Sequence, residues 1–107
     1  MKIFWTRNAL DDLHDIRRYL KESQSIAYAK KITLDILAEV NSLEQQPGKG
    51  SFVRELEDLH LTTHRQLLAG QHRIIIECAP GGVIYVHLIA HTSRDLEALI
   101  RRRLLNS

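Results

Sequence analysis

The later half of the chain concentrates arginine and histidine, the side chains best suited to holding an anion or moving a proton. All five lysines lie at or before Lys49, whereas five of the six histidines lie between His60 and His91. Arginine presents a planar fork of donors to a phosphate or carboxylate, and histidine titrates near neutral pH. The candidate target-binding residues are Arg65, Arg73, His87, His91, Arg94, Arg101, Arg102 and Arg103.

Most of these residues fall on predicted strands. Segments 62–68, 72–78 and 83–90 are β-prone and are separated by Ala69-Gly70-Gln71 and Pro80-Gly81-Gly82, so antiparallel hairpins are expected. Alternation along the last strand predicts a core face and an opposite face. The core face would carry Ile84, Val86, Leu88 and Ala90, and the opposite face Val83, Tyr85, His87, Ile89 and His91.

Turn length decides which basic residues share a face. In the preceding strand, Ile74, Ile76 and Cys78 form the apolar set, which leaves Arg73, Ile75 and Glu77 on the other side. A three-residue turn at 80–82 predicts that Arg73, His87 and His91 lie on one face. Arg65 joins them if residues 69–71 also form a three-residue turn, whereas a two-residue turn places it on the opposite side.

The remaining elements form a scaffold around these strands. Residues 2–6 predict a short strand, and apolar residues at helical spacing predict a helix from about Asn8 to Glu22, a second helix from Ser25 to before Pro47, and a C-terminal helix. Segment 49–61 reads as a surface connection that could include one helical turn. The predicted fold is α+β in the order β-α-α-β-β-β-α, with a helical hairpin packed on a small, mainly antiparallel four-stranded sheet.

Length and composition are those of one ordinary globule. The chain has 107 residues, 44% of them hydrophobic and 26% charged, so a single domain over 1–107 is expected. No apolar run of membrane-spanning length and no signal-peptide core is present, which predicts a cytoplasmic protein without a membrane partner. The net charge of +2 is too small to indicate a nucleic-acid binder by itself.

Several kinds of site are disfavoured by spacing. Neither a G-x-S-x-G elbow nor a glycine-rich phosphate loop occurs, and the lone Cys78 reads as a small buried hydrophobe. A metal site would need His60, His64, His87 and His91 to converge from a loop and two strands, without the local cysteine or carboxylate pairs that zinc sites usually enlist. We therefore predict no metal and no cofactor.

The order of several short patterns resembles the RelE/ParE superfamily of bacterial toxins over nearly the whole chain, and more closely its ParE branch. The patterns are Ala9, Asp12-Leu13, Ile16 and Tyr19 in the helical hairpin, Leu43-x3-Pro47-Gly48 at its end, Arg73-Ile74-Ile75-Ile76, and His91-x2-Arg94-Asp95. The resemblance implies the toxin of a type II toxin–antitoxin, plasmid-stabilisation system. It also implies a cognate antitoxin that holds the toxin inactive in a hetero-oligomer.

Two mechanisms within that superfamily compete. RelE-like members cut messenger RNA on the ribosome, and Arg65, Arg73, His91 and Arg94 would then be the catalytic candidates. That branch usually adds lysines before the position of Arg73 and a tyrosine after that of Arg94, and this chain has neither. The His91-x2-Arg94-Asp95 ending and the arginine-rich last helix look like the ParE branch, which inhibits DNA gyrase by binding. Gyrase is therefore the predicted target, with ribosome-dependent cleavage of messenger RNA as the alternative.

Simpler roles for the same residues stay open at this point. Arg94 could pair with Asp95 or Glu97, Arg73 could pair with Glu55 or Glu77, His91 could cap its strand, and Arg101 to Arg103 could be solvated. The apolar residues of the last helix are expected to be exposed and to receive an antitoxin segment by helix-in-groove docking or strand addition. These antitoxin-binding candidates are Leu96, Leu99, Ile100 and Leu104.

Overall fold

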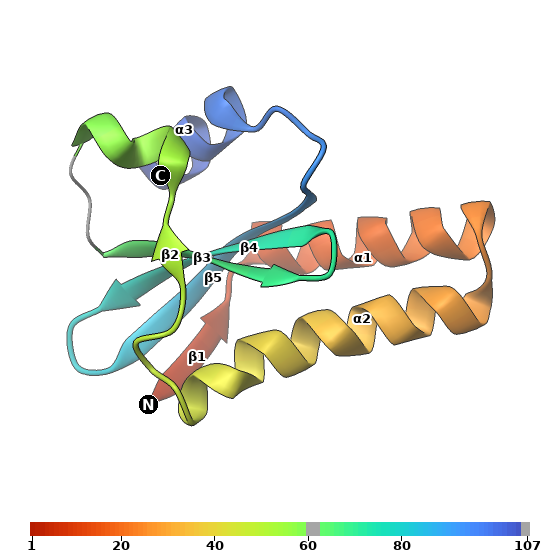
Figure 1. Ribbon diagram of the computed structural model, residues 1–107, viewed down its shortest axis with the longest axis horizontal. Helices are drawn as coiled ribbons and strands as arrows, with labels where there is room; N and C mark the ends of the chain where they lie inside the picture. Colours follow the sequence, from red (N-terminus) through yellow and green to blue (C-terminus); the bar gives the residue numbers. More distant parts are fainter. Residues whose placement is uncertain (60–62, 106–107) are drawn as a thin grey trace.

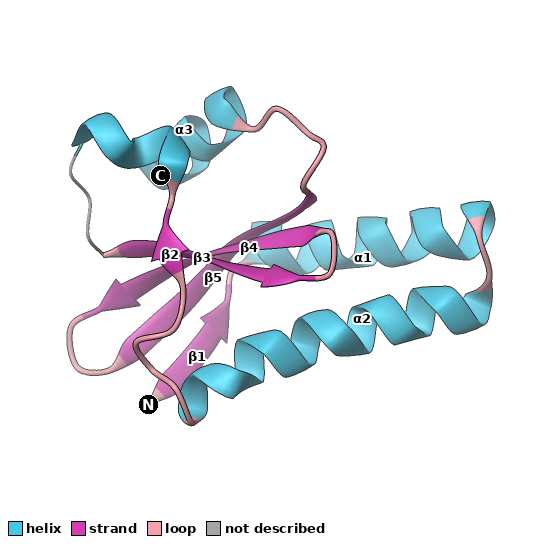
Figure 2. Ribbon diagram, in the orientation of Figure 1, coloured by secondary structure: helices cyan, strands magenta, loops and turns pink. Residues whose placement is uncertain are grey.

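The computed structural model of the chain describes residues 1–59 and 63–105 (Figures 1 and 2). A helical hairpin follows the first strand, a run of strands forms the rest of a sheet, and a helix ends the described chain. The elements are β1 (Lys2–Trp5), α1 (Arg7–Ser23), α2 (Ile26–Asn41), η1 (Ser42–Glu44), β2 (Ser51–Phe52), η2 (Arg54–Leu59), β3 (His64–Ala69), β4 (His72–Ala79), β5 (Val83–His91) and α3 (Glu97–Leu105).

One five-stranded sheet in the order β1-β5-β4-β3-β2 organises the molecule. β1 pairs in parallel with β5 and the other neighbours are antiparallel, so the predicted α+β class with its helical hairpin is confirmed. The prediction of four strands is wrong by one, because Ser51–Phe52 pairs with β3. A two-residue strand is too short to show alternation in the sequence. The helix η2 follows it, and His60 and Leu61 of the predicted connection lie outside the described residues.

Side-chain caps start both long helices. Thr6, two residues before the predicted start, accepts a hydrogen bond from the backbone N–H of Ala9, and Ser25 accepts one from that of Tyr28. Each cap satisfies a backbone donor that has no partner inside the helix. The tip of the hairpin extends beyond the sheet (Figure 1), and Ile26 at the start of α2 is exposed.

Two apolar cores lie on opposite faces of the sheet. The helical hairpin covers one face, and η2 and α3 cover the other (Figures 1 and 2). The hairpin core includes Ile36, Val40, Leu43, Leu67, Ile74, Ile76, Ile84, Val86 and Ile89. The α3 core consists of Val53, Leu56, Ile75, Leu88, Ala90, Leu96 and Ile100, with Leu99 and Leu104 packed against it.

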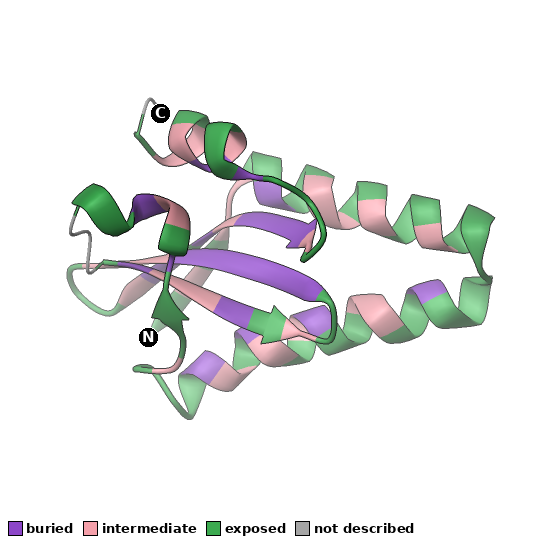
Figure 3. Ribbon diagram, turned by 45° about the horizontal axis from the view of Figure 1, so that its top comes forward, coloured by how far each residue is buried: buried purple, intermediate pink, exposed green. Residues whose placement is uncertain are grey.

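Burial on both faces explains the run Ile74-Ile75-Ile76, all three of which have no exposed surface. Successive side chains of a strand point to opposite faces, so a strand covered on both sides carries apolar residues without alternation. Figure 3 shows the central strands buried between the layers. Among the described residues, no helix is long and apolar enough to cross a membrane.

A β-bulge at His87 changes the predicted faces of β5. Ile75 pairs with Leu88 but Ile76 pairs with Val86, so His87 is an extra residue between them. Ile84 and Val86 face the helical hairpin as predicted, whereas the assignment of Leu88 and Ala90 to the same face is wrong. Beyond the bulge those two residues belong to the α3 core, and Ile89 belongs to the hairpin core.

Turn lengths place the remaining basic residues. Ala79 pairs with Val83, which confirms the three-residue turn at 80–82, where Gly81 and Gly82 both have positive φ. Ala69 pairs with His72, so the other turn has two residues and Arg65, opposite Ile76, lies on the hairpin face. Arg65 and Arg73 are therefore on opposite faces of the sheet.

Candidate functional site

An open groove lies between the edge of the sheet at β2 and β3 and the turn that follows β5. It has a volume of about 670 Å³. Its rim exposes two large apolar side chains, Phe52 at 66% and Leu68 at 53% of their surface. The groove is lined by Phe52, Arg54, Glu55, Gln66, Leu68, Arg73, Thr92, Ser93, Arg94 and Asp95.

Arg73 lies in the groove but is committed to a buried ion pair. Its side chain is 7% exposed, and its Nη1 and Nη2 donate to Glu55 Oε2 and Oε1 over 2.6 and 2.7 Å. Its Nε donates to Gln66 Oε1 over 2.8 Å. Hydrogen bonds from Arg73 lower the pKa of the Glu55 carboxyl below its ordinary value, and they outweigh burial, which raises it. Arg73 thus ties β4 to η2, as the simpler pairing with Glu55 predicts.

Arg94 is the candidate cation that remains available in the groove. Its side chain is exposed and makes no hydrogen bond or ion pair with residues 1–59 and 63–105. The backbone N–H of Arg94 donates to the His91 carbonyl over 3.2 Å, which fixes its place in the turn. The predicted pairing with Asp95 or Glu97 is not formed in this part of the chain, where Asp95 instead accepts from the backbone N–H of Glu97. Arg54 adds a second exposed cation to the groove.

His91 lies on the opposite face from Arg73, so the prediction that they share a face is wrong. The bulge reverses the alternation, and His91 pairs with His72 with their ring centroids 5.5 Å apart. The His91 Nδ1 accepts from the backbone N–H of Ser93 over 3.1 Å, and Nε2 lies 3.0 Å from Gln71 Oε1. His91 therefore holds the turn that carries Arg94, which agrees with the strand-capping interpretation.

The arginines of α3 differ in their contacts. Arg101 pairs with Asp58 at 2.9 Å, and Arg103 forms two bonds to Asp12 of α1, at 2.6 and 3.0 Å. The same Asp12 accepts from the backbone N–H of Ile89 over 3.0 Å, so it links α1, β5 and α3. Arg102 is exposed and has no ion pair with the described residues.

The expectation that the apolar residues of α3 are exposed is wrong. Leu96 and Ile100 are 1% and 0% exposed, and Leu99 and Leu104 are half-buried against the same core. The reason is that Val53 and Leu56, from a segment read as a surface connection, complete a second core under α3. Antitoxin binding by the apolar residues of α3 stays a prediction, and it requires α3 to separate from the sheet.

The structure thus brings two predicted arginines, Arg73 and Arg94, to one groove and distributes the others. His87 shares the α3 face with Arg73 but pairs with Glu77, outside the groove. The sequence did not identify Phe52, Arg54 and Leu68, because β2 has no detectable pattern and the position of β3 beside it depends on strand pairing. The exposed groups include the cations of Arg54 and Arg94, the carboxylate of Asp95 and the apolar side chains of Phe52 and Leu68, a mixture that suits binding of a macromolecule.

Comparison with known proteins adds to this geometry. A family model described as the ParE toxin of the type II toxin–antitoxin system parDE matches residues 3–96. A solved structure described as the chromosomal ParDE TA system from P. aeruginosa superposes with a TM-score of 0.71 and 23% identity, and covers 87% of this chain and 97% of that chain. A search of curated proteins gave no match. The matched family range ends before α3.

Proposed function

Because this chain belongs to the ParE toxin family of type II toxin–antitoxin systems, we propose that it inhibits DNA gyrase by binding it through the groove. The chain is the toxin of such a pair and has an antitoxin as its partner. The observation that supports gyrase binding is the exposed guanidinium of Arg94, which has no partner among residues 1–59 and 63–105, in one groove with the exposed side chains of Phe52 and Leu68.

This combination has the chemistry of a protein-binding surface. Aromatic and arginine side chains provide a large share of the binding energy at protein interfaces. Phe52 and Leu68 offer apolar area to bury, and Arg94 offers a planar donor fork to a carboxylate or phosphate of the partner. The buried Arg73–Glu55 pair lines the same groove and adds no net charge.

The same geometry supports binding over cleavage of RNA. Phosphodiester cleavage needs a group that moves a proton and cations that stabilise the developing charge, all within reach of one phosphate. Arg65 lies on the other face of the sheet, Arg73 is bonded through Nε and both terminal nitrogens, and both ring nitrogens of His91 are engaged. Of the four candidates for catalysis, Arg94 alone is available in the described groove.

Supercoiling and cleavage-complex assays with purified gyrase test the proposal. We expect the wild-type toxin to inhibit supercoiling, and Arg94→Ala and Phe52→Ala each to weaken inhibition at least tenfold, as expected for anchor residues worth more than about 1.4 kcal/mol. Arg17→Ala is the matched control, because Arg17 is an exposed arginine on α1, on the hairpin side of the sheet. It should inhibit like the wild type.

A parallel assay on programmed ribosomes tests the alternative. Unchanged gyrase activity at a large molar excess of toxin would rule out the gyrase proposal. Messenger-RNA cleavage that is abolished by Arg94→Ala would then assign the groove to RNA. Complex formation with the cognate antitoxin provides the folding control, since each variant must still bind it.

A further inference from the structure

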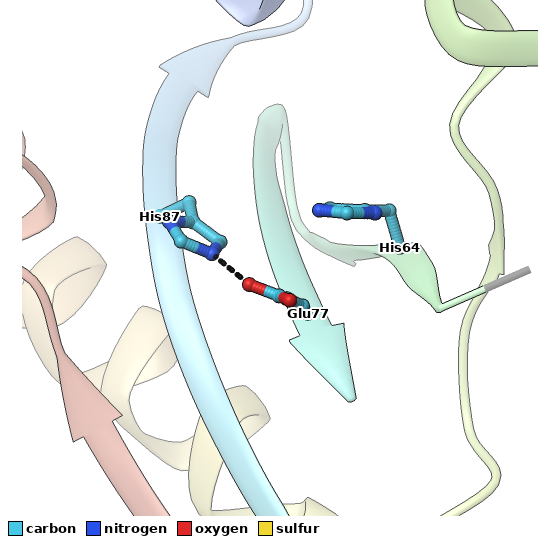
Figure 4. Close-up of side chains that lie close together, drawn as sticks. All are labelled: His64, Glu77 and His87. Carbon is cyan, nitrogen blue, oxygen red and sulfur yellow. Dashed lines mark hydrogen bonds and ion pairs between the residues drawn. The ribbon is translucent and has the colours of Figure 1, made fainter. Parts of the chain in front are cut away.

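Three potential metal ligands from three neighbouring strands meet on the α3 face of the sheet, outside the groove. His64 of β3 is the cross-strand partner of Glu77 in β4, and Nε2 of His87, the bulge residue of β5, lies 2.8 Å from Glu77 Oε1 (Figure 4). One ligand atom from each residue can be chosen so that all lie within 4.8 Å of one another. We propose that His64, Glu77 and His87 bind a divalent transition metal of the zinc type.

The donor set fits zinc in kind and in spacing. Two imidazoles with one carboxylate form a recognised zinc set that leaves a fourth position for water. Ligand atoms at about 2.0 to 2.1 Å from a tetrahedral ion are about 3.3 Å from one another. His87 Nε2 and Glu77 Oε1 are 2.8 Å apart, and no two of the three ligand atoms are more than 4.8 Å apart, so side-chain movements of about 1.5 Å or less bring them to this spacing.

The surroundings of His64 prepare it as a ligand. Its Nδ1 lies 3.2 Å from the Thr63 hydroxyl, which leaves Nε2 for the metal and provides the outer hydrogen bond typical of metal-binding histidines. His64 is 7% exposed. Burial is the main cause that lowers the pKa of its imidazole; attraction to Glu77 opposes this effect, and repulsion from His87 adds to it. A neutral imidazole is the form that binds a metal.

Access and rigidity are combined at this site. Glu77 keeps 34% of its side chain exposed, which provides a path for the ion and space for a water ligand. The strands hold the three ligands at fixed register, and the site adjoins α3, where Arg103 Nη1 approaches the His87 carbonyl at 3.4 Å. An ion pair alone accounts for Glu77 and His87 but does not explain why a second imidazole, that of His64, lies beside them.

The predicted consequence is stabilisation of the fold by the metal, because one ion would connect β3, β4 and β5 next to α3. A ligand that binds only the folded state raises its stability as its concentration exceeds Kd. The inference is independent of the gyrase proposal. Glu77 was not among the predicted ligands, because its position opposite His64 depends on the register of β3 with β4.

Titration of the chelator-treated full chain with Zn²⁺ tests the inference, with calorimetry for stoichiometry and thermal unfolding as a second readout. We expect about one ion per chain and a rise in Tm. His64→Ala, Glu77→Ala and His87→Ala should each weaken binding at least tenfold and abolish the rise in Tm. His14→Ala is the matched control, because His14 is an exposed histidine on α1, and it should bind like the wild type.

Absence of stoichiometric binding to the wild type, or equal loss in the His14→Ala control, would overturn the inference. Where a ligand variant does not fold, zinc X-ray absorption of the wild-type chain gives the answer. Scattering from two imidazoles in the zinc shell supports the site, and a shell without imidazole overturns it.

Discussion

Removing the Glu55 carboxylate provides a sharp test of how the groove is built. Glu55→Gln keeps the size of the side chain but leaves the Arg73 guanidinium buried without a counter-charge. In the wild type, the two side chains are 12% and 7% exposed and share two hydrogen bonds of 2.6 and 2.7 Å. Because Gln66 accepts from Arg73 Nε alone, it cannot replace the lost charge.

The expected cost follows from this burial. Breaking a buried ion pair from one side typically costs about 3–5 kcal/mol, because the remaining charge has been removed from water. For a domain of this size, about 3 kcal/mol corresponds to a fall in Tm on the order of 12 °C. Arg73→Met combined with Glu55→Leu removes both charges and should recover most of the loss, since paired replacement by apolar residues is often close to neutral.

Urea unfolding of the wild type, Glu55→Leu, Arg73→Met and the double variant would measure this as a double-mutant cycle, with Glu55→Gln measured beside them. The pKa of Glu55 is lowered from its ordinary value of 4.5 in the folded state, so its contribution is complete above that pH and is lost as pH falls through the lower folded pKa. The double variant should lack this acid-dependent loss. A Glu55→Gln variant within about 0.5 kcal/mol of the wild type would refute the reasoning, because it would mean that the pair is solvated.

Three further perturbations probe other parts of the fold. Arg103→Ala should lower the free energy of unfolding by about 1–3 kcal/mol and speed amide exchange in α3, because it leaves Asp12, 16% exposed, with the Ile89 N–H as its remaining described partner. Unchanged exchange would show that α3 does not depend on this pair, and Arg102→Ala is the matched control. Burial, with repulsion from His91, lowers the pKa of His72 below 6.5, so the unfolded chain takes up the proton first and folding stability should fall as pH drops below 6.5. Urea titrations at pH 5.5 and 7.5 should show a smaller dependence on pH for His72→Gln, and an equal dependence in both proteins would contradict the assignment. Gly50→Ala should lower the free energy of unfolding by about 1–3 kcal/mol, because φ is +114° and the new Cβ would lie 3.1 Å from the Gln66 carbonyl oxygen. Gly48→Ala is the control in thermal unfolding, since a Cβ there meets nothing within 4 Å.

Local patterns in the chain were sufficient for the elements and for several of their ends. Apolar spacing located both helices of the hairpin, and Ser25 caps the second as its position before an apolar stripe predicts. The glycines at 81 and 82 marked a three-residue turn, because positive φ is accessible to glycine at little cost. These features depend on residues within a few positions of one another, so one sequence is enough to predict them.

Faces and partners required the folded chain. Whether β5 contains a bulge depends on its register with β4, and this one feature reversed the sides of Leu88, Ala90 and His91. The sequence shows that Arg73 and Arg94 are basic and near strand ends. It does not show that Glu55 neutralises the first while the second stays available.

The sequence by itself determined the fold class, the toxin family and the positions of the basic residues, because these follow from apolar periodicity, turn residues and the order of short patterns. The tertiary structure alone decided which arginines are paired, which leucines are covered, and that His64, Glu77 and His87 meet. The physical reason is separation along the chain. Asp12 and Arg103 are 91 positions apart, and only packing of both helices against one sheet brings their charges into contact.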